Sequence, residues 1–290
     1  MSATAVIQKN FYFLARRFVA GETIDSAMAA VRALNEAGMS ASLDFLGEDV
    51  LERSAALHTR DVYIRMLDAI RERGVNSNVS VKLTAMGLLL DEDFALENLQ
   101  AVVEHAARNA DPFVRIDMEG SSVVEATLRI FDRLYAAHQN VGIVLQAYLK
   151  RTAGDVQHAI SLGARVRLCK GAYNEPPEIA YKSMPEIRAH YLESARELLT
   201  RGNYPGIATH DHRLIAAVKR FVAGERIAND RFEFQMLYGC RPNVQRQLVA
   251  DGYRLRVYVP FGTHWAGYFY RRVLERRENA LFALSSVFSR

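Results

Sequence analysis

The most regular feature of the chain is an alternation between short apolar segments and longer segments with helical periodicity. Eight short segments are rich in Val, Ile, Leu and Phe, and several are almost continuously apolar. Such runs are typical of parallel strands that are covered on both faces. The predicted strands span 42–46, 78–83, 113–118, 141–149, 164–170, 206–211, 231–237 and 255–260.

Helical patterns fill the intervals between these strands. Examples lie at 94–108, in the middle of 178–202 and at 243–252, and a final helix is predicted at 265–278. Eight strands that alternate with helices favour a closed TIM-type barrel over an open, doubly wound sheet. The segment 1–35 is also helical in pattern and precedes the first strand. We therefore predict one α/β domain over 1–290, with a helical arm at 1–35 and a (βα)8 barrel at 36–290.

The composition fits one ordinary globular domain. The 290 residues are 50% hydrophobic and 24% charged, and a barrel of this type needs about 250 residues. The net charge of +4 is spread along the chain without a long Lys/Arg run, so a nucleic-acid partner is not indicated. The basic pI of about 9.1 would favour contact with an anionic membrane surface.

The two cysteines, Cys169 and Cys240, are far apart and form neither a disulfide framework nor a zinc pattern. The N-terminal segment lacks the features of a signal peptide, and no uncharged apolar run reaches the roughly 18 residues of a membrane span. We therefore expect a cytoplasmic protein, with peripheral membrane contact left open.

Catalytic groups of (βα)8 barrels lie at the carboxyl ends of the strands. In this sequence those positions are mostly cationic, amide or aromatic, with few carboxylates. They are Lys82, Asp117, Glu119, Gln146, Tyr148, Arg167, Lys170, His210, Asp211, Leu237, Tyr238 and Tyr258. Such a set suits an anionic substrate or a phosphate-bearing cofactor.

The final helix carries the segment YFYRRVLERRE. At about 100° per residue, Tyr268, Arg271, Arg272 and Glu275 lie within an arc of roughly 100°. Arginine binds carboxylates through two parallel hydrogen bonds, so this face could clamp a small carboxylate-bearing substrate. The same spacing also fits a solvated charged face, and the sequence leaves both interpretations open.

The segment RLCKGAYNEPPE at 167–178 follows the fifth strand. Arg167 and Lys170 supply two cations, and Gly171 and Ala172 let the backbone approach a large ligand closely. An arginine beside a flavin can stabilise the charge at its N1–C2=O locus or contact N5. An ordinary turn ended by two prolines is the alternative.

The segment IATHDHRLI places His210 and His212 on either side of Asp211. A metal site would need further ligands from other strands, but the other histidines fall in helical segments or, for His264, in the loop before the final helix. We favour a hydrogen bond from His210 or Thr209 to a cofactor. A helix cap by Asp211 is the simpler alternative.

Lys82 falls within the second predicted strand, where an unpaired ammonium is costly to bury. Asp117, at the end of the third strand, could pair with it, either for catalysis or as a structural salt bridge. Tyr258, at the end of the eighth strand, and Tyr268 could enclose a small apolar ring or be core aromatics.

Common cofactor and catalytic signatures are absent from the sequence. It has no G-x-G-x-x-G after a strand, no Walker A motif, no G-x-S-x-G and no H-E-x-x-H. A dinucleotide would therefore bind outside a Rossmann frame.

Seven segments in this order resemble the proline dehydrogenase family. They are VKLT (81–84), RIDME (115–119), QAYLK (146–150), RLCKGAY (167–173), ATHD (208–211), FQMLYG (234–239) and YxxRRxxxE (268–275). The resemblance runs over most of the chain, from 42 to 275. It implies a flavoenzyme on a distorted (βα)8 barrel, of the short monofunctional bacterial type.

The resemblance also implies a role for each matching residue. The implied catalytic residues are Arg167 at flavin N5, Lys82 and Asp117, with Asp117 orienting Lys82. The implied proline-binding residues are Lys82, Leu237, Tyr258, Tyr268, Arg271 and Arg272. The implied FAD-binding residues are Gln146, Arg167, Lys170, Gly171, Ala172, Tyr173, Thr209, His210 and Glu275. Asn174 departs from the tryptophan often found there, so FAD contacts in 174–190 stay unassigned, and no metal is implied.

The implied activity is oxidation of L-proline to Δ1-pyrroline-5-carboxylate, with hydride transfer from proline C5 to flavin N5 and electrons passed to a membrane quinone. The implied setting is the first step of proline catabolism to glutamate, at the inner face of the cell membrane, with pyrroline-5-carboxylate dehydrogenase as a functional partner. Two other classes stay open. One is a metal-dependent hydrolase barrel that uses His210, Asp211 and Asp117, and the other is a non-catalytic carboxylate-binding barrel.

Overall fold

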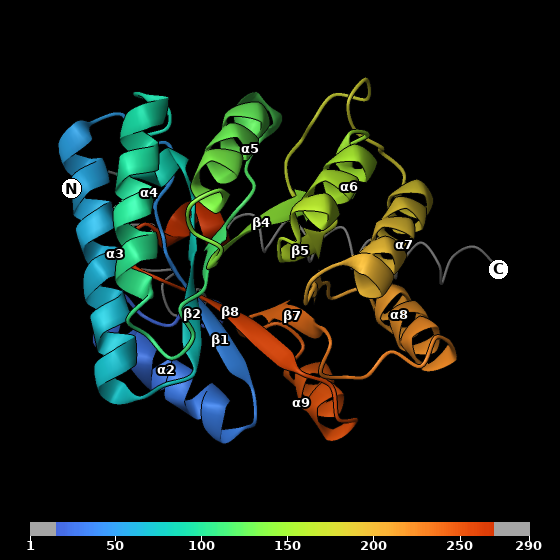
Figure 1. The fold of residues 1–290 in the computed structure, drawn as a ribbon. Coiled ribbons are helices and arrows are strands. Elements are labelled where there is room, and N and C mark those ends of the chain that lie inside the picture. Colours follow the sequence, from blue (N-terminus) through green and yellow to red (C-terminus); the bar gives the residue numbers. More distant parts are fainter. Residues whose placement is uncertain (1–15, 270–290) are drawn as a thin grey trace.

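Eight parallel strands close into a barrel in the computed structural model, which describes residues 16–269 (Figure 1). Each strand pairs with the next, and β8 returns to β1 with Tyr258 opposite Ser42. The predicted fold class and the order of all eight strands are confirmed. The strands are β1 (Ser40–Phe45), β2 (Ser77–Val81), β3 (Val114–Ile116), β4 (Val141–Gln146), β5 (Val166–Cys169), β6 (Gly206–Ala208), β7 (Glu233–Leu237) and β8 (Leu255–Phe261).

Seven helices connect these strands within residues 16–269 and surround the barrel (Figure 1). Polar caps fix several of their starts: Asp91 accepts from the Phe94 N–H at 2.7 Å, and the Ser183 side chain accepts from the Glu186 N–H at the start of the helix between β5 and β6. None of the helices in this part of the chain is long and apolar enough to cross a bilayer. They are α3 (Arg53–Arg73), α4 (Glu92–Ala106), α5 (Ser121–Tyr135), α6 (Thr152–Leu162), α7 (Met184–Arg201), α8 (His212–Gly224) and α9 (Pro242–Ala250), with a 3-10 turn, η1 (Thr84–Met86), after β2.

The described part of the N-terminal arm contains one helix, α2 (Ile24–Glu36). It starts at a capping box formed by Thr23 and Ser26. Residues 16–23 form turns, so the prediction of helix across the arm is wrong there, and 1–15 lie outside the described residues. The apolar stripe of α2 packs against β1 and β8 through Ala27, Met28 and Val31.

A further helix begins at Trp265, directly after β8, and its described part ends at residue 269. Trp265 and Tyr268 are buried in a small apolar cluster with Phe18, Val19 and Leu46, separate from the main core. In a regular (βα)8 barrel the helix after the eighth strand covers the seam between β8 and β1. Here α2 covers that seam.

The barrel interior is polar, unlike the branched apolar filling of most (βα)8 barrels. Alternate residues of a strand point to opposite faces, and on β1 the apolar Leu43 is fully buried in the main core. Ser42 and Asp44 point to the axis instead. The Ser42 hydroxyl lies 3.0 Å from that of Ser80 on β2, and Arg167 reaches Ser80 from β5 across the barrel.

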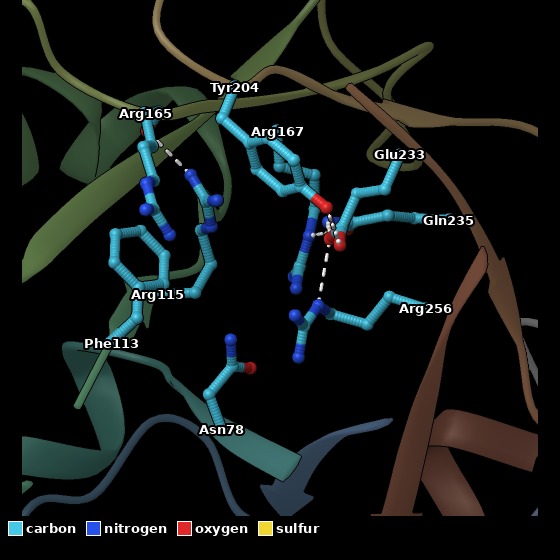
Figure 2. A pocket seen from close by; sticks show the side chains of 9 residues that line it. All are labelled: Asn78, Phe113, Arg115, Arg165, Arg167, Tyr204, Glu233, Gln235 and Arg256. Carbon is cyan, nitrogen blue, oxygen red and sulfur yellow. Dashed lines mark hydrogen bonds and ion pairs between the residues drawn. The ribbon is translucent and has the colours of Figure 1, made fainter. Parts of the chain in front are cut away.

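Polar side chains also fill the amino-terminal end of the barrel (Figure 2). Arg256 Nε donates to Glu233 Oε1 at 2.8 Å, and Arg115 Nη1 donates to the Arg165 carbonyl at 2.6 Å. A Cβ on Gly142 would lie 2.4 Å from the Arg165 carbonyl oxygen, so this packing requires a glycine. These groups surround a small cavity lined by Asn78, Phe113, Arg115, Arg165, Arg167, Tyr204, Glu233, Gln235 and Arg256.

Several observed strands end earlier than the sequence predicts. β2 ends at Val81, so Lys82 follows the strand and does not lie within it, and β4 ends at Gln146 although the apolar pattern continues to residue 149. The apolar run continues because the segments after these strands are buried. β8 runs on to Phe261, so the prediction that Tyr258 ends this strand is wrong.

Candidate active site

The residues predicted as catalytic converge near the carboxyl ends of the strands. Asp117, directly after β3, accepts hydrogen bonds from Arg167 Nη1 on Oδ1 and from the Tyr258 hydroxyl on Oδ2, both at 2.7 Å. Arg167 lies on β5 and Tyr258 on β8. The side chains of Arg167 and Asp117 are buried, with 8% and 12% of their surface exposed. One carboxylate therefore links three strands of the barrel into a fixed polar unit.

Lys82 is held by a carboxylate that the sequence analysis did not select. Its Nζ lies 2.9 Å from each oxygen of Asp44, the buried acidic residue of β1. The predicted pair of Lys82 with Asp117 is therefore wrong in its partner. Asp117 is already bonded to Arg167 and Tyr258. Its only effect on Lys82 is that its charge raises the pKa of the ammonium.

Several groups fix the Arg167 side chain. Besides Asp117, it donates from Nε to the Gln235 side chain and from Nη2 to the Ser80 hydroxyl at 3.0 Å. Its guanidinium carbon lies 5.3 Å from the centre of the Tyr258 ring, within the range of a cation–π contact. The orientation of Arg167 is thus set by the barrel before any ligand binds.

Burial and nearby charges set the protonation states of Tyr258, Lys82 and Asp44. Burial raises the pKa of Tyr258 well above its ordinary value, and the charge of Asp117 acts in the same direction, so the phenol stays neutral. Burial alone would lower the pKa of Lys82, but the charges of Asp44 and Asp117 outweigh it and the pKa is raised. The pKa of Asp44 is raised by burial, against the opposing effect of Lys82. The Lys82 ammonium is therefore charged at physiological pH.

The predicted cofactor residue Gln146 ends β4 and His210 follows β6, the two strands that flank the Arg167 strand β5. Gln146 donates from Nε2 to the Glu119 carbonyl at 2.9 Å. The Leu237 N–H donates to His210 Nε2 at 2.9 Å, so the proton of a neutral His210 ring sits on Nδ1. These hydrogen bonds hold the ends of β4, β6 and β7 in position. They thereby fix where Gln146 and His210 can contact a ligand.

Asp211 is the cap that the simpler interpretation predicted. Its carboxylate accepts from the Arg213 N–H at 3.0 Å at the start of α8, and its own N–H donates to the Thr209 hydroxyl at 3.0 Å. It also pairs with Arg188 at 2.7 Å and lies 3.7 Å from Lys170 Nζ. Within residues 16–269 no three His, Cys, Asp or Glu side chains are grouped as metal ligands.

Gly171 takes a backbone conformation that suits only glycine. Its φ is +115°, and an added Cβ would lie 2.2 Å from the Tyr148 ring. The group that the Gly171 backbone approaches within the chain is Tyr148, and the predicted approach to a ligand stays a prediction. The turn after Lys170 is therefore held against the end of β4.

The segment after Gly171 is anchored at one buried residue. Ala172 is exposed and Tyr173 is partly buried. Glu175 is buried and accepts from the Ser121 N–H at 2.8 Å, at the start of α5. This bond satisfies an otherwise free amide of the helix N-terminus and fixes the segment over the barrel.

Part of the predicted substrate site lies outside the described residues. Arg271, Arg272 and Glu275 fall in 270–290, so the arginine clamp stays a prediction. Tyr268 is described and is buried in the small apolar cluster of the N-terminal arm. Leu237, the last residue of β7, is partly buried.

The sequence analysis missed Asp44, Ser80 and Gln235, which position the predicted residues. Each has a polar neighbour two positions away in its strand: Ser42 with Asp44 in SLDFL, Asn78 with Ser80 in NVSVK, and Glu233 with Gln235 in FEFQM. Polar residues at every second strand position would have indicated a polar axis. The apolar runs, which correspond to the outer faces of the strands, obscure this alternation.

The donor set at the strand ends fits a flavin cofactor. A flavin needs hydrogen-bond partners at its pyrimidine end, a cation near N1 or N5, and cations or amides for a pyrophosphate. Gln146 ends β4 opposite Cys169 of β5, and Arg167 lies two residues earlier on that neighbouring strand. Lys170 keeps 30% of its side chain exposed at the same face.

A closed parallel barrel with this buried Lys, Arg, Asp and Tyr network at its strand ends defines a (βα)8-barrel enzyme with a cationic site. Sequence comparison then gives the particular family. The family model described as proline dehydrogenase matches residues 27–284. Proline dehydrogenase 1 of Bacillus subtilis strain 168 is 42% identical over 273 residues, covering 94% of this chain and 90% of that protein. Proline dehydrogenase of Deinococcus radiodurans is 40% identical over 285 residues, covering 97% and 92%. The chain belongs to the proline dehydrogenase family and is an enzyme of that family, which is generally flavin-dependent.

A structural comparison agrees with this assignment. Proline utilization A of Bdellovibrio bacteriovorus, in a form inactivated by N-propargylglycine, superposes with a TM-score of 0.86 at 28% identity. The match covers 93% of this chain and 33% of that longer chain. The fold described above therefore corresponds to one part of a larger protein in that relative.

Proposed function

We propose that this chain catalyses the FAD-dependent oxidation of L-proline to Δ1-pyrroline-5-carboxylate, by hydride transfer from proline C5 to flavin N5. Membership of the proline dehydrogenase family supports oxidation of proline. The observation that carries the finer proposal is the pair of buried cations, Lys82 and Arg167, each held by its own carboxylate at the strand ends. One cation is available to the substrate carboxylate and the other to the flavin.

The proposed substrate site combines an anion clamp with an apolar wall. Proline has one carboxylate and a small saturated ring. In the proposal Lys82, Arg271 and Arg272 bind the carboxylate, because charge-assisted bonds from two arginines are strong and directional. Tyr258 and Tyr268, together with Leu237, enclose the ring. Asp117 holds the Tyr258 hydroxyl, so that the ring of Tyr258 presents a fixed face.

The flavin, when bound, supplies the hydride acceptor. In the proposal Arg167 lies near N5, and Gln146 contacts the pyrimidine end of the ring. Asp117 acts on this reaction through Arg167, whose orientation it fixes with a 2.7 Å ion pair. The remaining contacts to FAD are assigned to Lys170, Gly171, Ala172, Tyr173, Thr209, His210 and Glu275.

The substrate amine must lose its proton before hydride leaves C5. A neutral nitrogen lone pair assists the departure of hydride, whereas an ammonium opposes it. The rate should therefore rise with pH toward an apparent pKa that belongs to the bound amine.

The proposal extends to the electron acceptor and to the fate of the product. We propose a membrane quinone as acceptor, reached from the cytoplasmic side, and a dehydrogenase for pyrroline-5-carboxylate as the functional partner. Bifunctional protein PutA of Escherichia coli, 32% identical over 314 residues, covers 93% of this chain, which in turn spans 24% of PutA. A second activity joined to such a barrel supports the idea of a partner that consumes the product.

Anaerobic mixing of the purified protein with L-proline tests the proposal. The protein should be yellow, and proline should bleach its visible absorbance without oxygen. A colourless protein with bound zinc would support the hydrolase alternative and overturn the proposal. Proline binding without bleaching would support a non-catalytic binding barrel. D-Proline serves as a control for the fit of the site.

A further inference from the structure

Asp44 and Lys82 form the most deeply buried ion pair near the strand ends. Asp44 is fully buried, and the side chain of Lys82 is 10% exposed. Both Asp44 oxygens lie 2.9 Å from Lys82 Nζ. An ammonium has three N–H donors, and both hydrogen bonds from this one go to Asp44. One N–H therefore remains beyond the two hydrogen bonds to Asp44.

The charges around Lys82 come from two strand ends. Asp44 lies on β1, and Asp117 and Glu119 follow β3. Asp117 is bonded to Arg167 and Tyr258, and Glu119 accepts from the Thr84 N–H at 3.1 Å and its hydroxyl at 2.6 Å. Asp44 is therefore the carboxylate that sets the position of Lys82.

Two tyrosines complete the surroundings of Asp44. The Tyr63 hydroxyl, from α3, lies 3.4 Å from Asp44 Oδ1 but donates to the Ser80 carbonyl at 2.6 Å. Tyr258 is the other tyrosine, and a hydrogen bond from its hydroxyl lowers the pKa of Asp44. Lys82 is thus the strongest donor to Asp44, and the position of its ammonium depends on the Asp44 carboxylate.

Stability gives no reason to bury such a pair. Taking two charges out of water costs several kcal/mol each in order of magnitude, and apolar replacements are often neutral or stabilising. A pair that leaves one N–H beyond its two bonds to Asp44 is instead suited to hold the ammonium for a ligand. We propose that Asp44 is a positioning residue, which fixes the Lys82 ammonium where it binds the substrate carboxylate. This inference rests on the proposed role of Lys82 in proline binding.

Kinetics of Asp44→Asn in the FAD-loaded enzyme test the inference. The KM for proline should rise at least about tenfold, because an ammonium without its buried counter-charge is neither fixed nor fully protonated. The alkaline limb of the kcat/KM profile should move to lower pH, since loss of Asp44 lowers the pKa of Lys82. Asp44→Glu, which keeps the charge, should restore the position of that limb. Asp61→Asn, at a half-exposed surface pair, is the matched control and should leave both values unchanged.

A second measurement does not depend on activity. Competitive acetylation of Lys82, followed by mass spectrometry across pH, reports the protonation of its amine directly. Lys82 should become reactive at lower pH in Asp44→Asn than in the Asp61→Asn control. Identical reactivity profiles would overturn the inference, whatever the protein oxidises.

The double variant covers a failure of Asp44→Asn to fold. Lys82→Met removes the charge, so Asp44→Asn added to Lys82→Met leaves no unpaired buried ammonium. If Asp44 acts through Lys82, the KM of the double variant should match that of Lys82→Met. A further increase of about threefold or more would show an independent role and overturn the inference. Failure of the wild type to oxidise proline would refute the proposed function instead, and the labelling would still test the pair.

Discussion

The carboxylate of Asp117 can be tested as the link between Arg167 and Tyr258 by Asp117→Asn. The substitution preserves the shape of the side chain and removes the charge that accepts two 2.7 Å hydrogen bonds. Removing one partner of a buried ion pair costs about 3–5 kcal/mol, because the other charge stays buried. Tyr258→Phe removes one hydrogen bond to a charged group and should cost about 1.5–3 kcal/mol.

These energies predict measurable shifts in the melting temperature. An unfolding entropy of about 2.1 cal/mol/K per residue gives roughly 0.6 kcal/mol/K for 290 residues. Asp117→Asn should therefore lower the Tm by about 5–8 °C, and Tyr258→Phe by about 2.5–5 °C. Differential scanning calorimetry of the two variants at neutral pH measures both shifts directly.

The double variant separates a linked network from two independent contacts. Because both substitutions act on the same carboxylate, the combined loss should fall short of the sum by about 1–3 kcal/mol. Asp117→Asn combined with Tyr135→Phe, on α5, is the control and should be additive within about 0.5 kcal/mol. Strict additivity of Asp117→Asn and Tyr258→Phe would refute the description of Asp117 as a shared acceptor. A Tm of Asp117→Asn within about 1 °C of the wild type would refute the estimate itself.

Three further predictions address the turn, the clamp and the buried phenol. Gly171→Ala should lower the free energy of unfolding by about 2 kcal/mol or more, because the φ of +115° and the Tyr148 ring both oppose a Cβ. Urea unfolding measures this loss, and a loss below about 0.5 kcal/mol would contradict the prediction. Arg271→Ala and Arg272→Ala should each raise the KM for proline by about tenfold or more with FAD content nearly unchanged, and unchanged KM in both would refute the clamp. The pKa of Tyr258 is raised in the folded state above its ordinary value of 10.0, so its contribution to stability is complete below about pH 10 and is lost at higher pH. Alkaline unfolding should therefore be shallower in Tyr258→Phe, and identical pH curves for the variant and the wild type would contradict the predicted burial.

The sequence predicted the strands well because their outer faces form long apolar runs. Parallel strands under helices need apolar residues at each outward position, and Leu43 on β1 is an example that is fully buried. The helix starts were visible for a similar reason, since caps such as Asp91 are local. Strand ends were less predictable, because Lys82 and the residue after it stay buried without belonging to the strand.

The partner of Lys82 could not be derived from the sequence. Asp117 was a reasonable choice, because it also lies at a strand end. The choice between Asp44 and Asp117 depends on the register of β1 with β2, in which Leu43 lies opposite Val79. No local pattern encodes that register. The same holds for Gln235, which meets Arg167 across the barrel from a strand 68 residues away.

The seam between β1 and β8 has a consequence for the way this chain reaches its native state. Arg256 donates to the Ala41 carbonyl at 2.8 Å across 215 residues of chain, and α2 covers the same seam from the N-terminal side. Contacts this distant in sequence form late and slow folding. During synthesis β1 therefore emerges with one edge unpaired until β8 arrives. We expect closure of this seam to be the slow step, and partly made chains to associate through the open edge of β1 unless it is shielded.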